Sequence, residues 1–204
     1  MASTVPAAHA SSSTLLDPAF LRSAFDAGVG YDAYLSTGNT GQQSAWRDFH
    51  ARVRLTPEQQ RLVGGFTRRM PVLVSSGVWC GDCVQQVPML DHIARANPDH
   101  IELRIVDRDE HAELARRVML AGGLRVPVVL FLNEDFDLVS LFGDRTLSRY
   151  RALAARQLRA SCPLPGAPVP PDEVAATLQD WVNEFERVAL MLRLSTKLRQ
   201  RHGD

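Results

Sequence analysis

Hydrophobic residues change their spacing several times along the chain, and each change predicts a different element. Four short runs rich in branched and aromatic residues predict β-strands, and the last two, joined by the turn sequence NEDFD, predict a hairpin. Helical spacing comes before and between them. The predicted strands are 71–76, 101–107, 126–132 and 138–143, and the predicted helices are 57–69, the stretch after Cys80, 110–121 and 146–158. This alternation predicts an α/β domain over residues 56–160.

The segments on either side follow other patterns. Residues 1–14 are rich in serine and alanine and predict a disordered tail, and residues 15–55 predict small helices joined by loops. Residues 161–172 form a proline-rich linker, and residues 173–204 predict one long helix. The extra helices would therefore lie outside the α/β domain.

The C-terminal helix carries an apolar stripe at spacings of four and three. Its members are Val174, Leu178, Trp181, Phe185, Val188 and Leu192. Such a stripe docks either onto the protein's own domain or onto a second surface, as in a homodimer or a complex with a partner. The sequence alone does not decide between these two arrangements.

Composition and charge exclude several classes of protein. The chain has 204 residues, with 23 lysines and arginines balanced by 23 acids, so no net field favours nucleic acid or an anionic membrane as a partner. It has no long apolar run for a membrane helix, and its first residues lack the features of a secretory signal. Three cysteines are too few for a disulfide scaffold, which favours a reducing, cytoplasmic location.

Two of the cysteines form the main chemical signal. Cys80 and Cys83 lie where a predicted strand passes into a predicted helix. Unpaired backbone N–H groups and the helix dipole stabilise a thiolate at that position, and Cys83 follows one turn later on the same helical face. The pattern predicts thiol–disulfide exchange, with Cys80 as the attacking thiolate and Cys83 as the thiol that releases the reduced target.

The motif Trp79-Cys80-Gly81-Asp82-Cys83 resembles the active site of the thioredoxin family, whose motif is W-C-G-P-C. Pro88 and the pair Val126-Pro127 extend the resemblance, which covers roughly residues 57–160. It implies a thioredoxin fold, with a central mixed sheet flanked by helices, here with extra N-terminal helices and a long C-terminal helix.

The resemblance also implies roles for single residues. It makes Cys80 the nucleophile and Cys83 the resolving thiol, with Trp79, Gly81 and Asp82 in supporting positions. Pro88 would kink the active-site helix. Pro127 would be a cis-proline facing the dithiol, so that the backbone of Val126 pairs with an extended substrate segment. The expected substrates are disulfide-containing proteins, and a thiol or a reductase would supply electrons, with no cofactor besides the dithiol.

This sequence departs from the family in the groups that would accept a proton. Val74 stands where thioredoxins carry a buried aspartate, and Leu103 stands where its partner lysine is expected. Water, Gln86 or a substrate group would then have to accept the proton of Cys83.

The second departure is Asp82, which replaces a proline. An acid in the first helical turn complements the helix dipole. Its negative charge would also raise the pKa of Cys80, which would make the Cys80–Cys83 redox couple more reducing. Arg125, just ahead of the expected cis-proline, would either counter Asp82 or contact substrate, or would be a solvated surface residue.

Three alternatives remain. A zinc site needs more ligands than one C-x-x-C pair, and His92 and His111 are expected on helix surfaces. Cys162, in the linker, is either incidental or a third redox thiol. The chain could instead be an adaptor that binds a partner through its extra helices and uses the dithiol as a sensor.

Overall fold

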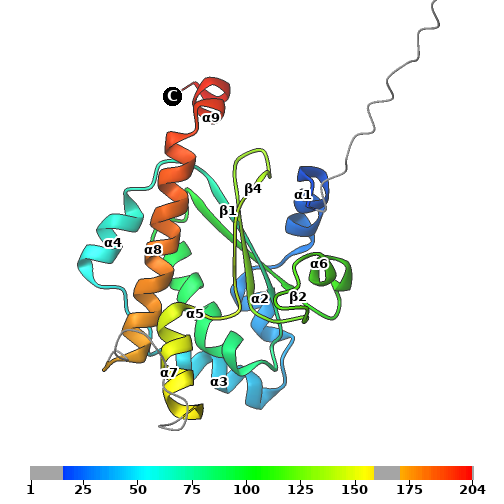
Figure 1. Ribbon diagram of the computed structural model, residues 1–204, viewed down its shortest axis with the longest axis vertical. Coiled ribbons are helices and arrows are strands. Elements are labelled where there is room, and N and C mark those ends of the chain that lie inside the picture. The colour runs from blue at the N-terminus through cyan, green and yellow to red at the C-terminus, as the bar shows by residue number, and fades with distance from the viewer. Residues whose placement is uncertain (1–15, 159–170, 204) are drawn as a thin grey trace, which may run out of the picture.

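A four-stranded mixed sheet forms the centre of the molecule (Figure 1). The computed structural model describes residues 16–158 and 171–203. The strands are β1 (Met70–Ser76), β2 (Ile101–Asp107), β3 (Val128–Leu132) and β4 (Leu138–Gly143), in the order β2-β1-β3-β4. β1 is parallel to β2 and antiparallel to β3, and β3 and β4 form the predicted hairpin. The expected sheet and its hairpin are confirmed.

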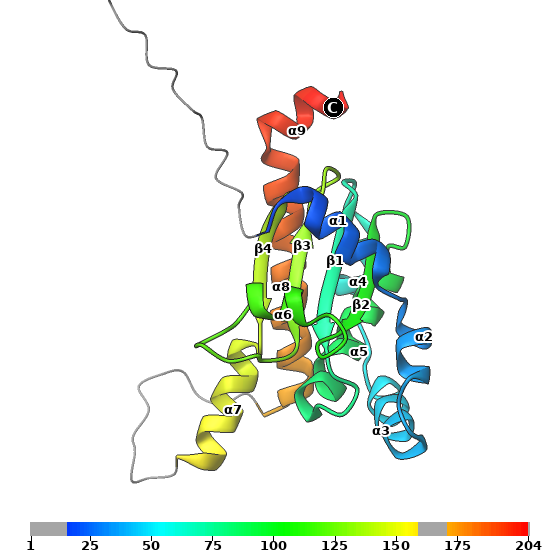
Figure 2. The ribbon, with the colours of Figure 1, turned by 90° about the vertical axis from the view of Figure 1, so that its right-hand side faces the viewer.

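Helices surround this sheet along the described chain. They are α1 (Pro18–Ala27), α2 (Tyr31–Ser36), α3 (Thr40–His50), α4 (Pro57–Gly64), α5 (Gly81–Arg95), α6 (Ala112–Arg117), α7 (Leu147–Gln157), α8 (Glu173–Leu194) and α9 (Thr196–His202). Figure 2 shows α1 and α6 on one face of the sheet and α8 on the other. Both faces are covered, so β1 and β3 are buried along their whole length.

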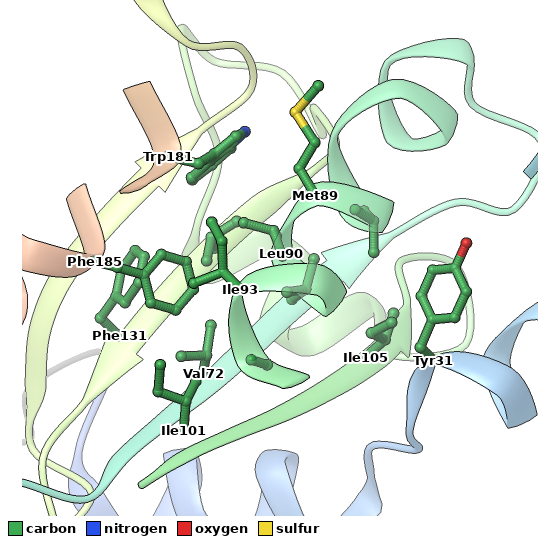
Figure 3. Packing of buried hydrophobic residues seen from close by; sticks show 14 of the residues in the cluster. Tyr31, Val72, Met89, Leu90, Ile93, Ile101, Ile105, Phe131, Trp181 and Phe185 are labelled. Atoms are coloured by element: carbon green, nitrogen blue, oxygen red, sulfur yellow. The ribbon is translucent and has the colours of Figure 1, made fainter. Parts of the chain in front are cut away.

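The apolar stripe of α8 docks onto the protein's own core. Phe185 packs edge-on against Phe131 of β3 with ring centroids 5.0 Å apart, and Trp181 packs against Phe142 of β4 at 4.9 Å. Figure 3 shows the rings of Phe131, Phe185 and Trp181 beside Leu90 and Ile93 of α5. The stripe is therefore accounted for by intramolecular packing.

Helix α4 is shorter than the sequence pattern predicts. It ends at Gly64 rather than at Arg69, because Gly65 caps it with its backbone N–H and the chain then turns. The side-chain amide of Asn97 donates to the carbonyls of Val63 and Phe66, at 2.8 and 2.9 Å. Those bonds satisfy carbonyl groups that a longer helix would have used.

Three other boundaries differ from the predicted ones. The helix expected over 110–121 is limited to Ala112–Arg117, because the backbone leaves the helical region at Val118 (φ −116°, ψ 26°). The chain then turns through Ala121 and Gly122 at positive φ. The strand expected from Val126 begins at Val128, after a proline that has no N–H to donate. The C-terminal helix is interrupted at Ser195, whose hydroxyl accepts from the Leu198 N–H and caps α9.

The predicted tail, nearly all of the proline-rich linker and Cys162 lie outside the described residues. Within the described ranges, no helix combines the length and the apolar content needed to cross a bilayer.

The packing of α8 predicts a large difference between two of its residues. Phe185→Ala removes a fully buried ring and should lower the free energy of unfolding by about 3–5 kcal/mol. Leu190→Ala, at a position 54% exposed on the same helix, should change it by about 0.5 kcal/mol or less. Chemical denaturation measures both, and equal effects would contradict the docked arrangement.

Candidate redox site

The two cysteines occupy the junction between β1 and α5. Cys80 is the N-cap residue of α5, with extended backbone at φ −86° and ψ 124°, and its side chain makes no capping hydrogen bond. It is partly exposed, whereas Cys83 in the first turn is fully buried. Both are free thiols. One sulfur therefore faces the surface while the other lies in the core.

The environment favours ionisation of Cys80. A hydrogen bond from Cys83 is the largest influence and, with the backbone N–H groups of Cys83 and Asp82, lowers the pKa of Cys80 to about 6. Burial and the Asp82 carboxylate act in the opposite direction. A thiol with this pKa is mostly a thiolate at neutral pH and is a competent nucleophile.

Cys83 behaves in the opposite way. Burial raises the pKa of its thiol well above the ordinary value, and the neighbouring Cys80 raises it further. The side chain of Ser76 and the backbone N–H of Gly77 partly offset these effects. Cys83 therefore holds its proton while Cys80 has lost its own.

A loop ahead of β3 lies against Cys80. The Val126–Pro127 peptide bond is cis, as the family resemblance implies. The Cys80 sulfur is 3.6 Å from the carbonyl oxygen of Val126. Gly143 passes so close to this loop that a Cβ there would lie 2.6 Å from the Pro127 carbonyl oxygen. The structure thus brings together two segments that are 46 residues apart.

The other motif residues surround the dithiol. Trp79 is 49% exposed, and the Arg108 guanidinium lies 4.6 Å from its ring centroid. Gly81 is exposed in the first turn. Pro88 is buried inside α5, and since it has no N–H, the carbonyl of Val84 loses its usual intrahelical partner.

Asp82 is held by two arginines. Its carboxylate accepts from Arg145 at 2.5 Å and from Arg149 at 3.0 and 3.1 Å. The Asp82 side chain is only 16% exposed. Arg149 also binds Glu173 at 2.7 Å, so the network joins α5 to α7 and α8. The negative charge of Asp82 is therefore largely compensated.

Arg125 does not contact Asp82, contrary to one of the three expectations for it. It pairs with Asp144 at 3.2 Å, and its side chain is 45% exposed. Gln86 is fully buried, and its amide nitrogen donates to the backbone carbonyl of Asp144 at 2.8 Å. Both residues lie around the site, and both are engaged by the segment that precedes α7.

Sequence reasoning missed Arg145 and Arg149. The two arginines are four residues apart, a spacing that predicts side chains on the same side of a helix. The spacing does not predict that Asp82 is their partner. It also missed Trp46 of α3, whose ring N–H donates to the Val78 carbonyl at 2.9 Å. Such contacts between distant segments depend on the tertiary fold.

The two positions where the family would carry the buried aspartate and its partner lysine are apolar in the structure. Val74 is fully buried on β1 between Ile105 and Val129, and Leu103 is partly buried against the same core.

Within residues 16–158 and 171–203, no three His, Cys, Asp or Glu side chains come together as metal ligands.

The Asp82 network predicts a measurable change in Cys80. Asp82→Asn should lower the pKa of Cys80 below the wild-type value of about 6, because it removes a nearby negative charge and leaves Arg145 and Arg149 uncompensated. The stabilised thiolate should also make the couple less reducing. Thiolate absorbance against pH measures the shift.

The matched control for this variant is Glu58→Gln, which neutralises an exposed first-turn acid on α4. It should leave the Cys80 pKa unchanged. A Cys80 pKa in Asp82→Asn that equals or exceeds the wild-type value would refute the electrostatic role of Asp82.

Comparisons with known proteins agree with the fold. A crystal structure of a protein of unknown function from Pseudomonas aeruginosa is similar, with a TM-score of 0.63, 23% identity and coverage of 80% of this chain and 93% of that one. An HIV epitope scaffold gives a TM-score of 0.57, 25% identity and coverage of 82% and 92%. No curated protein matches the chain.

A family model, described as thioredoxin, matches residues 28–155. The match includes α2 and α3, whereas the motifs alone place the resemblance on residues 57–160. It also spans both cysteines, the Val126–Pro127 loop and most of α7. The match covers more than half of this chain, and the chain therefore belongs to the thioredoxin family.

Proposed function

We propose that the protein is a thiol–disulfide oxidoreductase that reduces disulfides through Cys80 and Cys83. The observation that carries this proposal is the contrast between the two thiols. Cys80 is partly exposed with a pKa of about 6, and Cys83 is buried with a raised pKa. Such a pair provides one nucleophile for the substrate and a second thiol that can later resolve the mixed disulfide.

In the first step, the Cys80 thiolate attacks one sulfur of the substrate disulfide. The bond between the Cys80 sulfur and that sulfur forms, the substrate S–S bond breaks, and the other substrate sulfur leaves as a thiolate that takes a proton from solvent. The product is a mixed disulfide at the partly exposed end of α5.

In the second step, Cys83 loses its proton and attacks the Cys80 sulfur. The Cys80–Cys83 disulfide forms, and the second substrate sulfur leaves and is protonated. The two cysteines have then supplied two electrons, and the substrate has become a dithiol. An external thiol or a reductase must return two electrons to complete the cycle.

The Val126–Pro127 loop is suited to hold the substrate. The Val126 carbonyl lies beside the Cys80 sulfur, so its backbone can pair with an extended substrate segment and align the disulfide for attack. Arg125 is half exposed next to it and is available to acidic groups of the substrate. Disulfide-containing proteins are the substrate class we propose, in the reducing environment of the cytoplasm.

The adaptor function has less support. The N-terminal helices α2 and α3 and the helix α8 bury their apolar faces in the protein's own core, which leaves less of them for a partner. Trp46 holds the loop that carries Val78 and Trp79. The extra helices therefore pack against the dithiol domain and position its active-site loop.

The proposed activity predicts that the wild-type protein reduces insulin disulfides with dithiothreitol as the electron donor and that Cys80→Ser abolishes the acceleration. Cys162→Ser is the matched control and should retain full activity, because the proposal assigns that thiol no role. Precipitation of the reduced insulin chains measures the rate. Equal rates for wild type and Cys80→Ser would contradict the proposal.

A second variant separates an oxidoreductase from an adaptor. Cys83→Ser cannot release the mixed disulfide, so it should accumulate covalent adducts with several disulfide-containing proteins, each through Cys80. Peptide mass mapping identifies the linked residue. Adducts with a single protein, or with none, would instead favour the adaptor.

A further inference from the structure

The resolving step requires Cys83 to become a thiolate inside the core. The sulfur is fully buried and burial strongly raises its pKa, so the negative charge needs hydrogen-bond donors within the protein. Val74 supplies none, since its side chain is aliphatic and fully buried. The amide nitrogen of Gln86 is already engaged with the Asp144 carbonyl.

Two buried hydroxyl groups lie near Cys83. Ser76, the last residue of β1, is fully buried, and Tyr34 of α2 is 2% exposed. Among the described residues, neither hydroxyl oxygen has a hydrogen-bond partner of ordinary geometry. Buried polar groups without partners are rare in proteins and call for an explanation.

The fold brings these groups to one place. Ser76 directly precedes Gly77, whose carbonyl accepts the Cys80 N–H at 2.9 Å, and Tyr34 packs in the same core cluster as Cys83. The Ser76 side chain also lowers the pKa of both Cys83 and Tyr34, as expected of a hydroxyl near both groups. Tyr34 is held there by the ring of Trp46, which it meets edge-on with centroids 5.7 Å apart. The same Trp46 anchors the Val78 carbonyl of the active-site loop.

We propose that Ser76 and Tyr34 take the place of a buried carboxylate in the resolving step. The Ser76 hydroxyl donates a hydrogen bond to the Cys83 sulfur as it becomes a thiolate, and the Tyr34 hydroxyl donates to the Ser76 oxygen. Ser76 touches a reacting atom and is a catalytic residue. Tyr34 acts through Ser76 and is a positioning residue.

The proton balance needs no further base. Cys83 gives up its proton, its sulfur bonds to the Cys80 sulfur, and the bond from Cys80 to the substrate sulfur breaks. The leaving substrate thiolate takes up the proton, so the two hydroxyls keep their own protons throughout. The step is thus stabilised by neutral donors, and this inference rests on the oxidoreductase function proposed above.

Other titratable groups also face this site. Cys80, the N-cap of α5, lies beside Cys83. Asp107, paired in register with Ser76, raises the pKa of Tyr34. The Asp107 carboxylate accepts the backbone N–H groups of Asp109 and Glu110, so it is engaged in a turn. The proposal assigns it no part in proton transfer.

Reaction of the reduced protein with the aromatic disulfide DTNB separates the two steps. With Cys162→Ser as the background, release of the first thionitrobenzoate reports attack by Cys80 and depends on the DTNB concentration. Release of the second reports attack by Cys83 and is independent of that concentration. Stopped-flow absorbance resolves the two phases.

Ser76→Ala should slow the second phase roughly tenfold to a hundredfold, the effect of one hydrogen bond to a charged group, and leave the first phase unchanged. It should also move the pH midpoint of the second phase upward, which a purely structural role would not do. Ser76→Thr should restore the rate. Tyr34→Phe should slow the second phase about threefold.

Two neighbours provide matched controls. Ser75→Ala removes a buried hydroxyl from the adjacent position of β1, and Tyr31→Phe removes another buried hydroxyl from α2, one that is coupled to Asp91 instead. Both should leave the second phase at the wild-type rate.

The inference would be overturned if Ser76→Ala released the second thionitrobenzoate at the wild-type rate and pH midpoint. It would also be overturned if Asp107→Asn slowed that phase as much as Ser76→Ala, since a carboxylate would then be the base. Failure of the wild-type protein to release a second thionitrobenzoate would instead refute the oxidoreductase function itself.

Discussion

Burial of one face of α5 against the sheet determines where both sulfurs lie. Cys83, Val87 and Leu90 recur at helical spacing and are fully buried, so the helix cannot rotate without exposing part of this face. Cys80 precedes the first turn and remains partly exposed at the helix N-terminus. The two thiols thus differ in pKa because the packing of a single helix places one inside the core and one at its edge.

The same constraint gives the flanking helices a role in the chemistry. α3 holds the loop ahead of Cys80 through the Trp46–Val78 hydrogen bond. Arg149 of α7 and Arg145, just ahead of that helix, neutralise Asp82. These helices are therefore part of the environment that controls the dithiol. An acid beside the nucleophile is tolerated because the two guanidinium groups compensate its charge locally.

Much of the fold and the centre of the site could be predicted from the sequence, because both depend on local patterns. Hydrophobic spacing located the four strands, and the position of Cys80 between a strand and a helix indicated its reactivity. Helix ends were harder to predict, because the end of α4 at Gly64 depends partly on Asn97, more than thirty residues away. The partners of Asp82 and the approach of Tyr34 to Ser76 result from tertiary packing, which spacing along the chain does not encode.

The central claim is that Cys80 and Cys83 form one two-electron redox couple. A redox titration tests it most directly: the Cys162→Ser protein is equilibrated over a series of thiol–disulfide buffers, its thiols are trapped with an alkylating agent, and the products are resolved by mass. The account predicts a single two-electron transition between the dithiol and an intramolecular Cys80–Cys83 disulfide. Absence of that disulfide at every buffer potential, or oxidation of Cys80 only to mixed disulfides with the buffer, would contradict it.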